Sequence, residues 1–208
     1  MTELGIIFAK GCSLGFLIAM VLGPIGIWCI QQTLSSGFWA GMAVGLGAAV
    51  ADGIYGTLAG LGLTVIIDFL VQQQFWLQLG GGAFLCYLGI RSLLSKPATE
   101  TALAQNQTSL VRLFTSTIFL TLANPVTILS FTALIATFGI TASTFSLSYT
   151  VILFTSVFLG STLWWIILSG GLTMARKYIS LNILRTINLI AGCFMLGFGL
   201  LAIIAILL

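Results

Sequence analysis

Long runs of apolar residues, separated by short polar breaks, dominate the chain. Six runs reach the length of about 20 apolar residues that a helix needs to cross a bilayer. They cover approximately Leu4 to Ile30, Phe38 to Ile67, Phe75 to Leu94, Leu113 to Phe138, Leu147 to Leu172 and Ile187 to Leu208. The pattern therefore predicts an all-α membrane protein, with six transmembrane helices in a single domain over residues 1–208.

The polar breaks divide the chain into two halves. They comprise Gln31 to Gly37, Asp68 to Gln74, Lys96 to Arg112, Gly139 to Ser146 and Thr173 to Thr186. The third break is the longest, and most of it lacks hydrophobic periodicity. We expect a loop there, at about residues 95–112, between a first repeat at about 1–94 and a second repeat at about 113–208.

Lysine and arginine gather at alternate breaks. Arg91, Lys96 and Arg112 flank the third break and Arg176, Lys177 and Arg185 the fifth, whereas the second and fourth breaks have none. The positive-inside rule makes the odd-numbered breaks, including the loop at 95–112, cytoplasmic and places both termini outside. Three spans in each half would invert the second half relative to the first, so we expect a 3+3 inverted repeat.

Glycine and proline positions favour such a repeat. Pro24 in the first run aligns with Pro125 in the fourth. One constant offset matches Gly82, Phe84 and Gly89 with Gly192, Phe194 and Gly199. Leu46-Gly47 can be laid on Leu159-Gly160 with a gap. Each run of the first half thus has aligned residues in the corresponding run of the second half.

Composition places the chain in lipid. Charged residues are 5% and hydrophobic residues 59% of the 208, against about 25% and 45–50% in soluble proteins. The net charge of +3 forms no basic stripe for nucleic acid. Because the chain has no His and no cluster of carboxylates or cysteines, we expect no metal centre, no cofactor and no enzyme. The acidic start at Thr2-Glu3 argues against a cleavable signal peptide.

Two prolines interrupt the first and fourth runs: Pro24 follows Gly23, and Pro125 follows Asn124. Proline gives no N–H to the helix, so carbonyls one turn back lose their partners where water is scarce. The half-helix ends would offer N–H groups to a carboxylate and carbonyls to an ammonium, and an amino acid carries both groups. The alternative is a pair of simple kinks satisfied by neighbouring Ser and Thr.

Asp52 is the one carboxylate near the middle of a predicted span. An acid there costs at least about 2.5–3.5 kcal/mol on insertion scales, so it should face the bundle interior and have a partner, or be protonated. The two proline breaks in corresponding runs indicate a membrane transport site. We expect Asp52 to bind the transported molecule (the cargo) or the ion coupled to its transport. The alternative is a buried helix-to-helix hydrogen bond. Tyr55 lies on the same face, and Asp52 could accept its hydroxyl.

Two further residues are weaker candidates for the site. Gln31 lies at the end of the first run. We interpret it as an interfacial cap, with a role as a ligand as the alternative. Trp165 lies deep in the fifth run and takes the place of Asp52 when the halves are aligned. It would either fill the core or pack against the cargo.

Four motifs occur in a fixed order: Gly23-Pro24, a glycine-rich second run with Asp52, Tyr87-Leu88-Gly89-Ile90-Arg91, and Leu122-Ala123-Asn124-Pro125. Over essentially the whole chain, this order resembles the lysine exporter (LysE/RhtB) family of amino-acid efflux transporters. The resemblance implies a multi-pass secondary transporter of the bacterial inner membrane, which exports amino acids on a proton or membrane-potential gradient. It also implies a homodimer.

By position, Gly23, Pro24, Asp52, Asn124 and Pro125 would inherit the roles of the family's motifs. The chain also departs from the family's pattern. Leu22 stands where the first motif usually has another proline, and Val126 stands where the fourth commonly has lysine. The identity of the exported molecule is therefore left open.

Two other classes share a related helix plan. A transmembrane thiol or electron carrier needs two cysteines facing each other across the repeat axis, and Cys29 in the first run has no counterpart in the fourth. A divalent-cation exporter needs more metal ligands than this chain offers, because it has one carboxylate within a predicted span and no histidine. Both classes stand as alternatives to amino-acid export.

Overall fold

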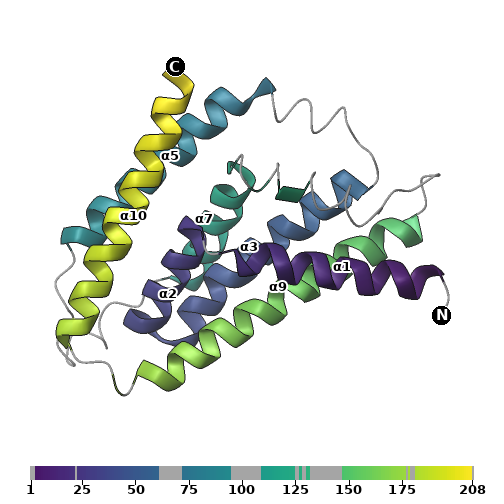
Figure 1. The fold of residues 1–208 in the computed structure, drawn as a ribbon, viewed down its shortest axis with the longest axis horizontal. Coiled ribbons are helices and arrows are strands. Elements are labelled where there is room, and N and C mark those ends of the chain that lie inside the picture. Colours follow the sequence, from purple (N-terminus) through teal and green to yellow (C-terminus); the bar gives the residue numbers. More distant parts are fainter. Residues whose placement is uncertain are drawn as a thin grey trace.

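The computed structural model describes residues 3–21, 23–60, 72–94, 109–124, 127, 130–131, 147–176, 178 and 181–207. All regular structure in these residues is helical (Figure 1). The helices are α1 (Glu3–Met20), α2 (Pro24–Ser36), α3 (Phe38–Gly60), α5 (Gln74–Leu94), α7 (Leu110–Leu122), α9 (Leu147–Arg176) and α10 (Leu181–Leu207). The all-α prediction is confirmed for the described part of the chain.

Three described helices, α3, α9 and α10, are individually long and apolar enough to cross a membrane. The bent pair of α1 and α2 meets the same requirement as one span, while α7 is apolar but shorter. Large apolar side chains such as Trp39, Leu147 and Met174 are exposed, whereas Asp52 and Ser161 are buried. This distribution suits a lipid environment, and the full set of six spans stays a prediction.

Local sequence explains where two helices begin and end. Pro24 occupies the first turn of α2, where a missing N–H costs little, and Gly23 before it is extended. Gly37 ends α2 with φ of +95°, a conformation that favours glycine. Ser109 caps α7 by accepting a hydrogen bond from the backbone N–H of Arg112 at 3.4 Å.

Several predicted boundaries are wrong. The first polar break was predicted to begin at Gln31, but α2 continues to Ser36. The fifth break is much shorter than predicted, because α9 extends to Arg176 and α10 begins at Leu181. Hydropathy marks the apolar length of a helix, whereas its backbone hydrogen bonds continue into polar sequence. Residues 61–67 and 132–138 of the predicted spans, and 95–108 of the loop, lie outside the described residues.

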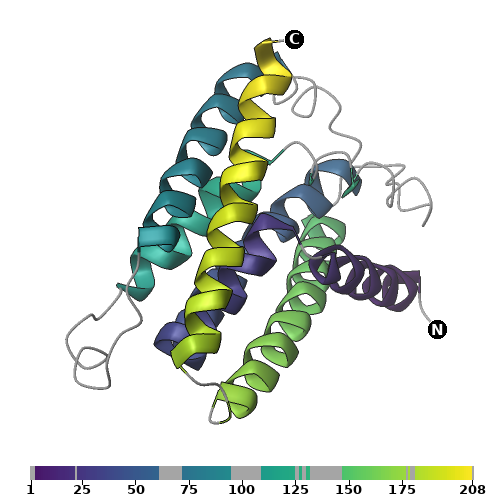
Figure 2. The same ribbon diagram turned by 60° about the vertical axis from the view of Figure 1, so that its left-hand side comes forward.

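The described helices pack in two groups. α5 and α10 lie side by side in both views (Figures 1 and 2). In the other group, α1 packs along α9, and α3 packs against both α9 and α7. α2 packs against α3 and also contacts α10, so it joins the two groups.

Glycines bring α5 and α10 into close antiparallel contact. A Cβ added to Gly82 would lie 2.9 Å from the carbonyl oxygen of Gly199, and one added to Gly89 would lie 2.9 Å from that of Gly192. The sequence alignment pairs Gly82 with Gly192, and the same offset pairs Gly89 with Gly199. When each glycine is replaced by its counterpart in the other half, the contact between Gly82 and Gly199 therefore becomes the contact between Gly192 and Gly89.

A second pair of contacts has the same relation. A Cβ added to Gly47 of α3 would lie 2.5 Å from the carbonyl oxygen of Phe114 in α7. One added to Gly160 of α9 would overlap the carbonyl oxygen of Cys12 in α1. Gly47 and Gly160 are aligned between the halves, as are the first and fourth runs. The packing of α3 on α7 thus corresponds to that of α9 on α1.

Candidate functional site

The first predicted span is broken at Gly23 and Pro24. The axes of Leu4–Met20 and Pro24–Ser36 differ by 76°. Among the described residues, no side chain caps the start of α2, and a Cβ added to Gly23 would have no neighbour within 4 Å. The N–H groups in the first turn of α2 carry the partial positive charge of a helix start. The interruption expected at Pro24 is therefore present, and no described residue fills the space beside Gly23.

The fourth predicted run is also interrupted, because α7 ends at Leu122. The N–H of Ala123 donates to the carbonyl of Phe119 at 2.9 Å, and that of Asn124 donates to the carbonyl of Thr121 at 3.2 Å. These bonds satisfy two of the last carbonyls of α7, which have no partner farther along the helix.

Tyr55 of α3 contacts the chain on both sides of this second interruption. Its hydroxyl donates to the backbone carbonyl of Leu122, and its ring centroid lies 5.9 Å from that of Phe131. The prediction that Asp52 accepts this hydroxyl is therefore wrong, because a terminal carbonyl of α7 takes the proton instead. Pro125 lies between the two contacts in sequence but outside the described residues.

Asp52 faces the interior of the bundle and is only 3% exposed. The Ser161 hydroxyl of α9 donates to Asp52 Oδ2 at 2.7 Å. Trp165 Nε1, one turn along α9, donates to Ser161 Oγ at 3.1 Å. The carboxylate thus has the polar partner that an acid within a membrane requires.

Sequence reasoning identified Asp52 and Trp165 but missed Ser161, which joins them. One signal was available, because Ser161 lies four residues before Trp165 and therefore shares its helix face. Serine is also a common packing residue in membrane helices. The pattern alone therefore could not distinguish Ser161 from other serines of the same run.

Gln31 belongs to a second polar cluster, which joins α2 to α5 and α10. Its Nε2 donates to Ser92 Oγ at 2.6 Å and to Asn188 Oδ1 at 3.2 Å. The Ser92 hydroxyl donates to the backbone carbonyl of Asn188 at 2.7 Å. Gln31 and Ser92 are 8% and 4% exposed. The interpretation of Gln31 as an interfacial cap is therefore wrong, because its amide is buried between helices.

We expect Gln31→Met to lower the stability of the protein by about 1 kcal/mol, since buried hydrogen bonds in membrane proteins contribute about 0.6 kcal/mol each on average. Methionine keeps the length of the side chain but cannot donate to Ser92 or Asn188. A thermal melt in detergent measures the effect. Gln32→Met is the matched control, because the half-buried Gln32 side chain is not part of the cluster. Equal melting temperatures for the two variants would contradict the assignment.

Arg176 connects the ends of α9 and α2. Its Nη2 donates to the backbone carbonyl of Ser35 at 3.0 Å. A cation there complements the partial negative charge at the C-terminus of α2. Arg91, Arg112 and Arg185 lie near the end of α5, the start of α7 and the start of α10. We call the side of the bundle defined by these four arginines the basic end.

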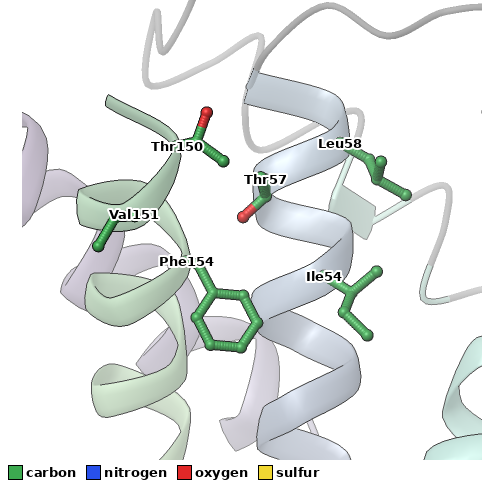
Figure 3. A pocket seen from close by; sticks show the side chains of 6 residues that line it. All are labelled: Ile54, Thr57, Leu58, Thr150, Val151 and Phe154. Carbon is green, nitrogen blue, oxygen red and sulfur yellow. The ribbon is translucent and has the colours of Figure 1, made fainter. Parts of the chain in front are cut away.

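A groove of about 320 Å³ lies between α3 and α9 (Figure 3). It is lined by Ile54, Thr57, Leu58, Thr150, Val151 and Phe154. The Thr57 hydroxyl donates to the carbonyl of Gly53 in its own helix at 2.8 Å. Asp52 is not among the lining residues, so this largely apolar groove offers no charged partner to a polar cargo.

Apolar helices, an interrupted span and a buried carboxylate define a helical membrane protein with a polar interior. The profile of the family described as "LysE type translocator" matches residues 16–205, and the chain belongs to this family. It is 26% identical over 195 residues to the "Putative amino acid efflux protein YcgF" of Bacillus subtilis (strain 168), and the match covers 93% of each chain. No solved structure matches the chain. The resemblance seen in the sequence motifs is confirmed.

Proposed function

We propose that this protein is a secondary active transporter that exports amino acids across the bacterial inner membrane by alternating access, coupled to protons or to the membrane potential. Its membership of a translocator family and its similarity to a protein named for amino acid efflux support the transport of small molecules. The observation that carries the proposal is a buried Asp52 on a helix that also contacts one of the two interruptions.

The chemistry of the interruptions suits an amino acid. The start of α2, which no described side chain caps, offers backbone N–H groups to the carboxylate of the cargo. Asp52 and the carbonyls at the end of α7 offer negative charge to its ammonium group. In this proposal, Gly23, Pro24, Asn124 and Pro125 form the cargo site with Asp52, and Asp52 also carries the coupling ion.

The packing supports an inverted repeat as the basis of alternating access. The reciprocal contacts of Gly82 with Gly199, and of Gly89 with Gly192, exchange when the halves are exchanged. An approximate two-fold axis in the membrane plane would produce such a pattern. The basic end would be cytoplasmic by the positive-inside rule, with both termini outside. A homodimer stays a prediction from the family resemblance.

Feeding dipeptides to a strain that overproduces the protein tests the proposed function. The cells hydrolyse the dipeptides, and every amino acid is measured in the medium. We expect one amino acid, or a few, to leave the producing strain faster than a strain with the empty vector. Equal efflux of all amino acids from both strains would contradict amino-acid export.

The same strain separates the alternative classes. A divalent-cation exporter would raise metal tolerance without changing amino-acid efflux. Among the described residues, no three His, Cys, Asp or Glu side chains are grouped as metal ligands. A thiol or electron carrier would lose activity when Cys12, Cys29, Cys86 and Cys193 are replaced by serine. Export of an amino acid should survive that replacement.

We expect Tyr55→Phe to slow export several-fold while the protein still folds. The substitution keeps the ring beside Phe131 but removes the donor to the Leu122 carbonyl, and an unpaired buried carbonyl costs about 1–3 kcal/mol. The measurements are backbone amide hydrogen exchange at the end of α7, which should be faster than in the wild type, and the export rate, which should be lower. Tyr149→Phe, in the same apolar cluster, is the control. Unchanged exchange and export would contradict a role for this contact.

A further inference from the structure

Three side chains form a directed chain of hydrogen bonds between α9 and α3. Trp165 Nε1 donates to Ser161 Oγ at 3.1 Å, and Ser161 Oγ donates to Asp52 Oδ2 at 2.7 Å. Trp165 and Asp52 are each 3% exposed, and Ser161 is fully buried. No bulk water therefore competes for these bonds.

The chemistry of the three groups sets the direction of the chain. An indole N–H can only donate, so the oxygen of Ser161 must accept from Trp165. Ser161 has a single hydroxyl proton, and that proton points to Asp52. With Oδ2 held in this way, the carboxylate cannot turn freely about its own axis. The direction of Oδ1 is then set as well.

Packing holds the start of the chain in place. A Cβ added to Gly45 of α3 would lie 2.5 Å from the Cβ of Trp165, so glycine is needed for Trp165 to approach this closely. Trp165 also belongs to the buried cluster that includes Ala19 near the end of α1 and Trp28 of α2. These two residues flank the first interruption.

The other end of the chain leads toward the second interruption. Asp52 lies one helical turn before Tyr55, which bonds to the end of α7 at Leu122. The chain therefore runs from a cluster beside Gly23 and Pro24 to the helix that contacts the interruption before Pro125. Its central member is Ser161, which no motif of the sequence identified.

We infer that Ser161 is a positioning residue, which holds the Asp52 carboxylate in the orientation that receives the cationic group, and that Trp165 orients the Ser161 hydroxyl. The inference rests on the proposed function, in which Asp52 binds the cargo or the coupling ion. Ser161 itself contacts neither. It acts by reducing the number of orientations that the carboxylate adopts before the cargo arrives.

Ser161→Ala tests the inference, with Ser156→Ala as the matched control. Both serines are fully buried on α9, but the Ser156 hydroxyl donates to the carbonyl of Leu153 in its own helix. We expect Ser161→Ala to lower kcat/KM for export at least about tenfold, which corresponds to about 1.4 kcal/mol. Ser156→Ala should stay within about twofold of wild type, since it leaves the Asp52 contact intact.

Infrared spectroscopy supplies a readout that is independent of transport. The chain has two aspartates, Asp52 and Asp68, so labelling aspartate with 13C at the carboxyl carbon gives two bands, and Asp52→Asn identifies one of them. Loss of the Ser161 donor should shift the Asp52 band, whereas Ser156→Ala should not. Trp165→Phe, which removes the N–H donor and keeps a smaller aromatic ring, should produce a smaller shift and a smaller loss of export.

An Asp52 band that is unshifted in Ser161→Ala, or an unchanged kcat/KM, would overturn the inference. If Ser161→Ala does not fold, Trp165→Phe decides by the same two measurements. A different result separates the inference from the proposed function. If the wild-type protein exports no amino acid while the Asp52 band shifts in Ser161→Ala, amino-acid export is refuted, and the control of the carboxylate by Ser161 is still confirmed.

Discussion

Asp52→Asn is expected to reduce export to the background of cells that lack the protein, while the protein still inserts and folds. Asparagine has nearly the same shape, and its side-chain oxygen can still accept the Ser161 hydroxyl. What it loses is the negative charge and the ability to bind a proton. The substitution therefore separates a structural hydrogen bond from a role in binding a cation or coupling its movement.

Export from loaded vesicles measures this effect, and a thermal melt in detergent confirms folding. Asp68→Asn makes the same chemical change in a predicted loop and is the control. Normal export by Asp52→Asn would show that the carboxylate serves only the contact with Ser161. That result would leave the structural alternative, a buried hydrogen bond between α3 and α9, as the role of Asp52.

Gly160→Ala is expected to lower the stability of the protein by about 1–3 kcal/mol, the usual cost of overpacking. The added Cβ would overlap the carbonyl oxygen of Cys12 and lie 2.9 Å from its Cα. Backbone atoms cannot move aside as a flexible side chain can, so α1 would have to shift away from α9. Because α1 leads into the interruption at Gly23 and Pro24, export should fall as well.

Gly171→Ala is the matched control on the same helix. A Cβ at Gly171 would meet no atom of the described residues within 4 Å. Alanine is also favoured over glycine inside a helix by up to about 1 kcal/mol. Melting temperatures in detergent should therefore fall for Gly160→Ala and stay level or rise for Gly171→Ala. A fall of equal size in both variants would mean that the close approach of α1 to α9 is not what requires glycine.

The interruptions and the buried acid have a common physical basis. Backbone carbonyls without helical partners, and a carboxylate, are costly in lipid unless other polar groups satisfy them. In the described residues, Tyr55 satisfies the end of α7 and Ser161 satisfies Asp52. Both partners come from neighbouring helices, so a movement of α3 against α7 or α9 would change the polar groups available to a cargo.

The sequence by itself determined the environment of the chain, the positions of its interruptions and its family. Each of these depends on a property that a residue keeps wherever it lies. Apolar runs of sufficient length favour lipid, and Pro24 cannot donate an N–H in any fold. The prediction that Asp52 would be buried with a partner followed in the same way, from the cost of a carboxylate in the membrane.

Only the tertiary structure decided which groups are partners. Tyr55 bonds to Leu122 and not to Asp52, Ser161 holds Asp52, and the Gln31 amide is buried between helices. Each of these contacts joins residues far apart in the chain. Their formation depends on which helices are adjacent and on how closely glycines such as Gly160 let the backbones approach. Hydrophobic periodicity within a single helix carries no information about helix adjacency or about the distance between helices.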